Sequence, residues 1–223
     1  AAALIRGRRN PRPGEVSLAH GGDLFLDELP EFNRHCGEVW REPMDSGPVT
    51  LSRPSYKPTY PASCQLVAAS VPCACGYLGD EQRHCRCTPE QVQRYRGRIS
   101  GPLLDRIDLH IQVPRQAPGL LLEKPGAGES SAQIRQRVSH CRNRQLERQH
   151  CCNARLGSDT LLDNCRLDRR QRDALAGLAA QMQLSGRGLH RTLRVARTIA
   201  DMAGRDRIDQ ADIAEALAFR EHC

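Results

Sequence analysis

The sequence predicts an α/β fold in two parts, a core with a parallel sheet in residues 1–115 and an all-α second domain in residues 129–223. Two observations lead to this prediction. Short apolar runs bounded by Gly and Pro fill the first part, as is typical of strands in a sheet. Beyond a Pro- and Gly-rich stretch at residues 116–128, which we expect to be a linker, helical periodicity dominates.

Each element of the first part is predicted from its pattern and its flanks. Residues 24–26 form a compact apolar run that stops at Asp27 and Glu28, as a buried parallel strand does where it reaches a site. The other expected elements are a short alternating strand at 15–19, a helix at 30–42, a hairpin at 49–61, a buried strand at 65–70, a polar helix at 90–96 and a final strand at 108–113.

Four helices are predicted in the second part. Ser130 and Ser131 are expected to cap the first helix, which runs to Gln149, and Asp209 is placed to cap the last. The remaining helices are expected at residues 167–182, 188–202 and 210–220.

The composition restricts the kind of partner. Of 223 residues, 39% are hydrophobic, which is enough for an ordinary core, whereas only 4% are aromatic, which limits base stacking. The net charge of +7 suits a polyanion such as nucleic acid. The alternative is a basic surface that is merely solvated.

The location and the redox state are also predicted from composition. No apolar run reaches the roughly 18 residues of a membrane span, and the first residues do not resemble a signal peptide, so we expect a cytoplasmic protein without a membrane partner. The chain begins without Met and is expected to be a fragment. Its eleven cysteines are odd in number, which favours reduced thiols or a bound metal over disulfides.

Asp27 and Glu28 have the residue types that nucleotide hydrolysis needs. One carboxylate can hold Mg²⁺ through water, and a second can orient the attacking water. A strand that ends in two acids also occurs by chance, where the acids only cap the next helix. The sequence motifs around the pair therefore matter.

Those motifs resemble one family, the ComM-type (YifB-like), magnesium-chelatase-like AAA+ ATPases. The resemblance begins at residues 11–15 and 17–20 and includes Leu24-Phe25-Leu26-Asp27-Glu28 and the residues up to 32. It continues, in the family's order, at residues 49–53, 98–108 and 193–201. It therefore covers nearly the whole chain.

The resemblance implies a partial AAA+ P-loop-type core followed by a helical lid, using ATP and Mg²⁺. It makes Asp27 and Glu28 the Walker B acids, with Asp27 holding Mg²⁺ through water. It makes Arg106 the arginine finger that reaches the nucleotide of a neighbouring subunit in a homo-oligomeric ring, expected to be a hexamer. The alternative for Arg106 is an internal salt bridge to Asp105 or Asp108.

The resemblance also makes Arg187, where a lid helix is predicted to begin, the sensor 2 arginine that contacts the phosphates. Arg191 is the second candidate for nucleotide contact. Because Arg194 and Arg197 follow at helical spacing, a basic helix face is the alternative interpretation.

Two Cys-x-Cys pairs are a candidate metal site. Four thiolates can close a tetrahedral Zn²⁺ site, and the nine residues between the pairs allow them to meet. The spacing inside each pair is tighter than usual, so free cysteines are the alternative. The four residues are Cys73, Cys75, Cys85 and Cys87, with His84 beside the second pair.

Two features depart from the family. The phosphate-binding Gly-x4-Gly-Lys-Ser/Thr loop, which the family has upstream, does not occur in the 223 residues, so we expect this chain alone to be inactive. Val71 stands where the family has the sensor 1 asparagine, and valine cannot position a water molecule unless Ser70 compensates.

Three functions stay open at this stage. The family implies a ring-forming motor that acts on DNA, single-stranded or branched, in branch migration during natural transformation. The second is a magnesium-chelatase motor subunit for metal insertion into a tetrapyrrole. The third is a non-catalytic fragment stabilised by zinc.

Overall fold

The computed structural model describes residues 13–32, 40, 44, 47–50, 58–116, 119 and 128–220 of the chain. The chain divides into two compact units, Ala1–Arg106 and Ile107–Cys223. The linker expected at residues 116–128 lies mostly outside the described residues. Among the helices that are described, none is long and apolar enough to cross a membrane.

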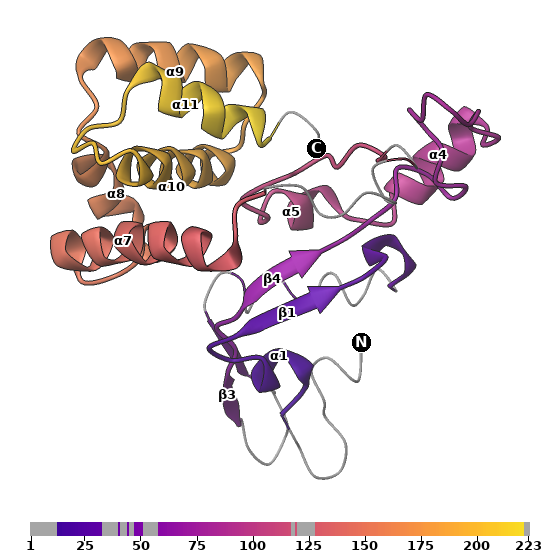
Figure 1. Cartoon of the computed structure of the whole chain (residues 1–223), viewed down its shortest axis with the longest axis horizontal. Coiled ribbons are helices and arrows are strands. Elements are labelled where there is room, and N and C mark those ends of the chain that lie inside the picture. Colours follow the sequence, from indigo (N-terminus) through magenta and orange to yellow (C-terminus); the bar gives the residue numbers. More distant parts are fainter. Residues whose placement is uncertain are drawn as a thin grey trace. The chain divides into compact units, whose positions relative to one another are not determined.

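The described strands of the first unit form two short sheets (Figure 1). β1, Asp23–Leu26, runs parallel to β4, Gln65–Ala68, in register along the whole length of both strands. β2, Pro48–Thr50, pairs with β3, Thr59–Pro61, in an antiparallel ladder. The mixed α/β prediction, its parallel sheet and its hairpin are confirmed.

The strands of the parallel sheet are less buried than the sequence predicts. Leu26 is 5% exposed, but Phe25 is 61% exposed and Val67, its partner in the register, is 41% exposed. Neighbouring side chains of a strand point to opposite faces. One face of the sheet therefore packs on the core, while among the described residues the other face keeps two large apolar side chains exposed.

The strand predicted at residues 15–19 is wrong, because these residues form the one-turn helix α1, Glu15–Leu18. In a strand, Val16 and Leu18 would share a face and be buried together. Instead Val16 is fully buried and Leu18 is 67% exposed. An alternation over five residues is too short to distinguish the period of a strand from that of a helix.

The core of the first unit gathers side chains from several of its segments: Val16, Leu26, Leu29, Trp40, Val49, Ala62 and Leu103. The helix predicted at residues 30–42 is described only at its start, as the 3-10 turn η1, Leu29–Glu31; residues 33–39 and 41–43 lie outside the described residues. The predicted polar helix is confirmed as α4, Pro89–Arg96, and α5, Gly101–Leu104, follows it.

The second unit is helical, as predicted, and α10 packs against α7, α8 and α11 (Figure 1). A one-turn 3-10 helix, η2, and the helix α8 were not predicted. Both are short, and α8 has no side-chain cap that would mark its start. The helices are α7 (Ser131–Gln149), η2 (Asn153–Arg155), α8 (Ser158–Cys165), α9 (Arg169–Gln181), α10 (Gly186–Met202) and α11 (Gln210–Ala218).

Capping boxes fix the starts of three of these helices. Ser130, Asp168 and Asp209 each accept a hydrogen bond from the backbone of the third helical residue, whose side chain bonds back to the backbone of the capping residue. The predicted caps at Ser130 and Asp209 are confirmed.

The strand predicted at residues 108–113 is wrong: within the described part of the chain the segment joins no ladder. Its backbone is held where the His110 N–H donates to the Phe219 carbonyl at 2.8 Å. Ile111 is 68% and Val113 79% exposed. Alternation alone does not make a strand, because a strand needs a partner edge.

Candidate functional site

The acidic pair lies where the sequence places it, directly after β1. Both side chains, Asp27 and Glu28, are exposed. The ladder continues beyond the strand, because the Ala69 N–H donates to the Leu26 carbonyl and the Leu29 N–H donates to the Ala69 carbonyl, both at 2.9 Å. The pair is therefore fixed at the carboxyl edge of the parallel sheet, where open α/β sheets bind ligands.

The backbone turns sharply at this pair. Glu28 has φ 51° and ψ 51°, in the left-handed region, which costs a residue with a side chain about 1–2 kcal/mol. Its N–H donates to Oδ1 of Asp27 at 3.0 Å. Strain of this kind is concentrated at functional sites, and here it occurs at one of two adjacent, exposed carboxylates.

The donor set at this edge fits a hydrated magnesium ion. Carboxylate oxygens are the ligands that Mg²⁺ prefers, and an exposed position leaves room for the waters that it retains. Asp27 would hold the ion through water. The 223 residues contain no Gly-rich phosphate loop, so these two acids would supply a magnesium ligand but no cradle for the phosphates.

Val71 follows β4 at the same edge and is 44% exposed. Its side chain has no polar atom, and Ser70, also exposed, is the nearest polar neighbour in the sequence. The loss of the sensor 1 amide stays a prediction.

Three residues near the acidic pair, Glu31, Tyr95 and Arg98, were not predicted as part of the site. The guanidinium of Arg98 lies over the ring of Tyr95, 5.5 Å from its centre, and donates to Oε1 of Glu31 at 2.7 Å. Burial, and then the carboxylates of Glu31 and Glu28, raise the pKa of Tyr95. Both Glu31 and Arg98 lie in the sequence runs that carry the family resemblance, and that was the signal that could have identified them.

Arg106 ends the first unit, just after α5. It is 6% exposed, and its Nη1 donates to the Pro102 carbonyl at 2.6 Å. An arginine finger that reaches another subunit would have to leave this position. That role stays a prediction.

Arg187 and Arg191 belong to the second unit. Arg187 lies in the first turn of α10 and is exposed. Arg191, one turn later, is 9% exposed and donates to Oδ1 of Asp108 at 2.6 Å. The nucleotide contact predicted for both stays untested.

The basic helix face, the alternative for these arginines, is wrong for those that follow in α10. Arg194 donates to the Leu156 carbonyl at 2.7 Å, and Arg197 is fully buried and donates to Oδ1 of Asp201 at 3.0 Å. Burial lowers the pKa of Arg194, with a smaller effect from the charge of Arg191. Their helical spacing suggested a solvent-exposed face, but these side chains are wholly or partly buried. Carbonyl and carboxylate partners compensate for the burial of their charges.

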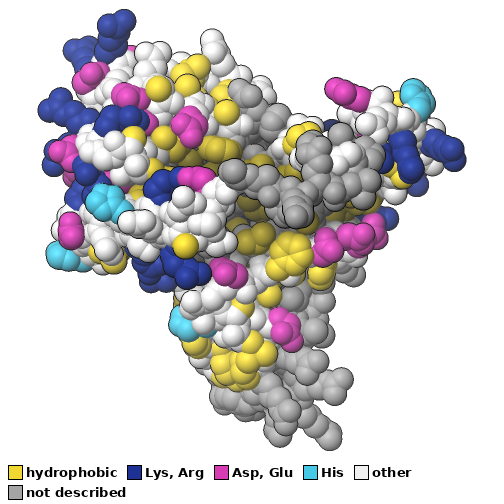
Figure 2. Space-filling model, viewed as in Figure 1, with side chains coloured by type: hydrophobic (Ala, Val, Ile, Leu, Met, Phe, Trp, Pro, Cys, Tyr) yellow, Lys and Arg dark blue, Asp and Glu magenta, His cyan; other side chains and the backbone are white. Residues whose placement is uncertain are grey.

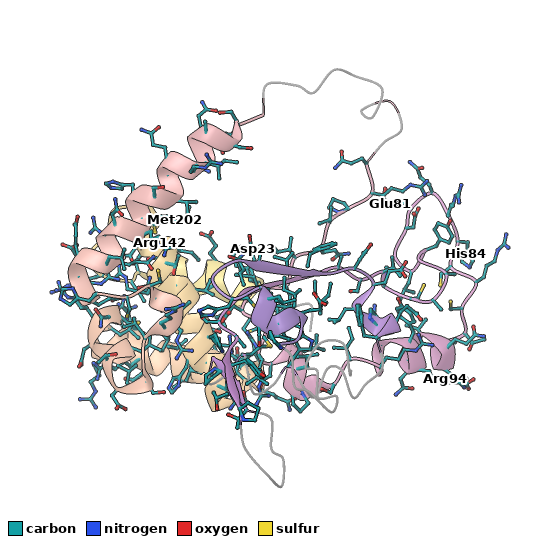
Figure 3. All side chains as sticks on the ribbon, turned by 90° about the horizontal axis from the view of Figure 1, so that it is seen from below. Asp23, Glu81, His84, Arg94, Arg142 and Met202 are labelled. Atoms are coloured by element: carbon teal, nitrogen blue, oxygen red, sulfur yellow. The ribbon has the colours of Figure 1, made fainter. Side chains whose placement is uncertain are left out.

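The four cysteines of the two Cys-x-Cys pairs meet in space, with all four sulfurs within 4.8 Å of one another. Figure 3 shows sulfur atoms gathered inside the loop that carries Glu81 and His84, beside the helix that carries Arg94. The exposed His84 does not join this group. We call Cys73, Cys75, Cys85 and Cys87 the cysteine cluster.

The thiols of the cluster differ in acidity. Backbone N–H groups at Tyr77 and Arg86 lower the pKa of Cys75 to about 6. Burial raises the pKa of Cys73, but backbone hydrogen bonds at Leu78 and Cys75 and a hydrogen bond with Cys85 outweigh it, and the net shift is downward. The cluster thus holds thiols that ionise readily, as metal ligands must.

The pKa values of the other two thiols, Cys85 and Cys87, are raised. A backbone hydrogen bond at Cys87 lowers the pKa of Cys85, but burial and the neighbouring thiols Cys75 and Cys73 raise it to about 12. Four thiols this close cannot all lose their protons without a positive charge among them.

Comparison with known proteins identifies two family models along the chain. The model described as magnesium chelatase, subunit ChlI, matches residues 1–121, and the model of the ChlI C-terminal part matches residues 128–220. Together they cover both units.

Individual relatives are similar over almost the whole chain. The uncharacterized protein YifB of Escherichia coli is 46% identical over 98% of this chain and 43% of its own length. The competence protein ComM of Haemophilus influenzae is 44% identical over 98% of this chain and 42% of its own. The chloroplastic magnesium-chelatase subunit ChlI of Glycine max is 24% identical over 96% and 46%. The chain thus spans less than half the length of these relatives.

Proposed function

Because this chain belongs to the magnesium chelatase family, subunit ChlI, and is of the ComM and YifB type, we propose that its full-length protein is an ATP-driven AAA+ motor acting on DNA. The motor is a homo-oligomeric ring, a hexamer, that moves single-stranded or branched DNA in natural transformation. Its support is the 44% identity to a competence protein over 98% of the chain.

The observation that carries the ATPase part is the strained, exposed acidic pair at the carboxyl edge of the parallel sheet. Asp27 would hold Mg²⁺ through water, and the bound ion would offset negative charge on the phosphates of ATP. Glu28 would accept a hydrogen bond from the attacking water and orient it. The two carboxylates therefore have different roles in the proposal.

The arginines complete this site in the proposal. Arg106 brings a positive charge to the transferring phosphoryl group of the neighbouring subunit, an effect of about 10³–10⁵ in rate in enzymes that use such a finger. Arg187 and Arg191 contact the phosphates from the helical unit. In the structure Arg191 donates a hydrogen bond to Oδ1 of Asp108 at 2.6 Å, a contact that phosphate would have to share or replace.

DNA is the favoured polyanion because the net charge is +7, and Figure 2 shows many Lys and Arg side chains, among some acidic ones, along one side of the helical unit. With 4% aromatic residues, binding rests on phosphate contacts and is expected to weaken steeply with salt. The exposed arginines include Arg135, Arg137 and Arg142 on α7 and Arg169, Arg170 and Arg172 on α9.

The test measures ATP hydrolysis by the full-length protein with no DNA, with single strands and with branched duplexes. We expect DNA to stimulate turnover. In Glu28→Gln, loss of the water-orienting carboxylate should lower kcat about 10²–10⁴-fold while nucleotide binding persists. The same change at the exposed Glu15 of α1 is the matched control and should leave kcat unchanged.

Two outcomes oppose the proposal. A Glu28→Gln protein with full turnover would remove the acidic pair from the mechanism. ATP hydrolysis that no DNA stimulates would favour the second candidate, a magnesium-chelatase motor, which rests on the 24% identity to the Glycine max ChlI subunit over 96% of this chain.

A further inference from the structure

The cysteine cluster has the dimensions of a single-ion site. In a tetrahedral thiolate site the metal–sulfur distance is about 2.3 Å, so the sulfurs lie about 3.8 Å apart. The Sγ atoms of Cys73 and Cys75 are 3.4 Å apart, and that of Cys85 lies 3.7 Å and 3.6 Å from them. Cys87 completes the group within 4.8 Å.

Other uses of four cysteines fit these distances less well. A disulfide needs its sulfurs about 2.05 Å apart, and all four residues are free thiols. A four-iron cluster fills the space among its ligands and so holds the sulfurs farther apart than one ion does. A set of four thiolates in tetrahedral arrangement is a preferred site for zinc.

The loop that carries the cluster has little apolar packing of its own. Between the two pairs, residues 76–84 contain only Tyr77 and Leu78 as large apolar side chains, and neither is buried. The first pair sits in a turn that Gly76, at φ 80°, closes by donating to the Cys73 carbonyl at 2.9 Å. The second pair leads directly into the Thr88 cap of α4.

We propose that Cys73, Cys75, Cys85 and Cys87 bind one Zn²⁺ ion as a closed structural site. The ion ties the segment that follows β4 to the start of α4. With four protein ligands it keeps no open position for water, so it takes no part in hydrolysis. The proposal does not depend on DNA or on ATP turnover.

The test is the metal content of the purified full chain, reconstituted with zinc under reducing conditions. We expect one zinc per chain in the parent and a loss of most of it in Cys85→Ser. Cys152→Ser, at a free cysteine outside the cluster, is the matched control and should retain one zinc. Cys85→His should also retain zinc, since imidazole is a zinc ligand, which separates ligation from a general folding defect.

A second readout follows the loop itself. Removal of zinc by a chelator should speed trypsin cleavage after the exposed Arg83 and Arg86, since cleavage needs local unfolding, while cleavage in the helical unit should not change. Three results would overturn the proposal: a parent chain that stays metal-free after reconstitution, a Cys85→Ser chain with as much zinc as the parent, or iron in place of zinc in the chain as purified, before reconstitution.

Discussion

At the residue scale, partners determine what a charged side chain of this protein can do. Glu28 and Asp201 are both carboxylates, yet Glu28 stands exposed on a strained turn while Asp201 is fully buried. Asp201 accepts hydrogen bonds from Arg148 and Asn153, at 2.9 and 2.8 Å. A buried charge with such partners serves the fold, and an exposed pair with few partners remains available for chemistry.

The carboxyl of Asp201 predicts how stability depends on pH. Burial raises its pKa, but hydrogen bonds from Arg148 and Asn153 and the charge of Arg197 outweigh burial and hold the pKa below its ordinary value of 3.8. A group whose pKa is lower in the folded state stabilises the fold above its unfolded pKa and loses that effect as the pH falls. The free energy of unfolding should therefore decrease below about pH 4.

Chemical denaturation at a series of pH values measures this dependence. Asp209, whose pKa is lowered by the backbone N–H of Asp212, adds to the same slope. A free energy of unfolding that stays constant from about pH 7 to about pH 3 would contradict the prediction.

At the element scale, a buried polar network as well as apolar packing joins the helices of the second unit. Asp201 of α10 connects Arg148 of α7, Asn153 of η2 and Arg197 of its own helix. The apolar core around this network includes Leu161 and Leu193, both almost fully buried. The sequence predicted these helices from their period and caps, but not which charges would be enclosed between them.

Asp201→Asn should destabilise the helical unit by about 3–5 kcal/mol, because it leaves buried guanidinium groups without their counter-charge. Thermal or chemical unfolding measures the loss. Asp173→Asn, at an exposed position on α9, is the matched control and should change stability by less than about 0.5 kcal/mol. Equal effects of the two substitutions would show that the network does not stabilise the unit.

At the scale of the whole molecule, the proposed nucleotide site would need a phosphate-binding loop, and the 223 residues contain none. The chain spans 42–46% of the length of the relatives compared with it, and it lacks a phosphate-binding loop. Without the backbone N–H groups and the lysine of such a loop, ATP loses most of its phosphate contacts.

We therefore predict that this chain by itself binds ATP weakly and hydrolyses none. The full-length protein should bind ATP tightly and hydrolyse it. Calorimetric titration with ATP and a phosphate-release assay on the two proteins compare them directly. Turnover by the isolated chain would show that its phosphate contacts come from residues not considered for that role.

The sequence by itself determined what depends on local pattern. It predicted the parallel strand that ends at Asp27 and Glu28, the helix starts at Ser130 and Asp209, and the family, because period, caps and motif words are properties of neighbouring residues. It failed at residues 15–19 and 108–113, where a short alternation indicated strands that the fold does not make.

Only the tertiary structure decided which distant residues meet. It brought the sulfurs of Cys73 and Cys85 to 3.7 Å, enclosed Arg197 against Asp201 and exposed Phe25 on a sheet that was expected to be buried. Burial and partner choice depend on contacts between segments far apart in the chain, and a local pattern carries no information about them.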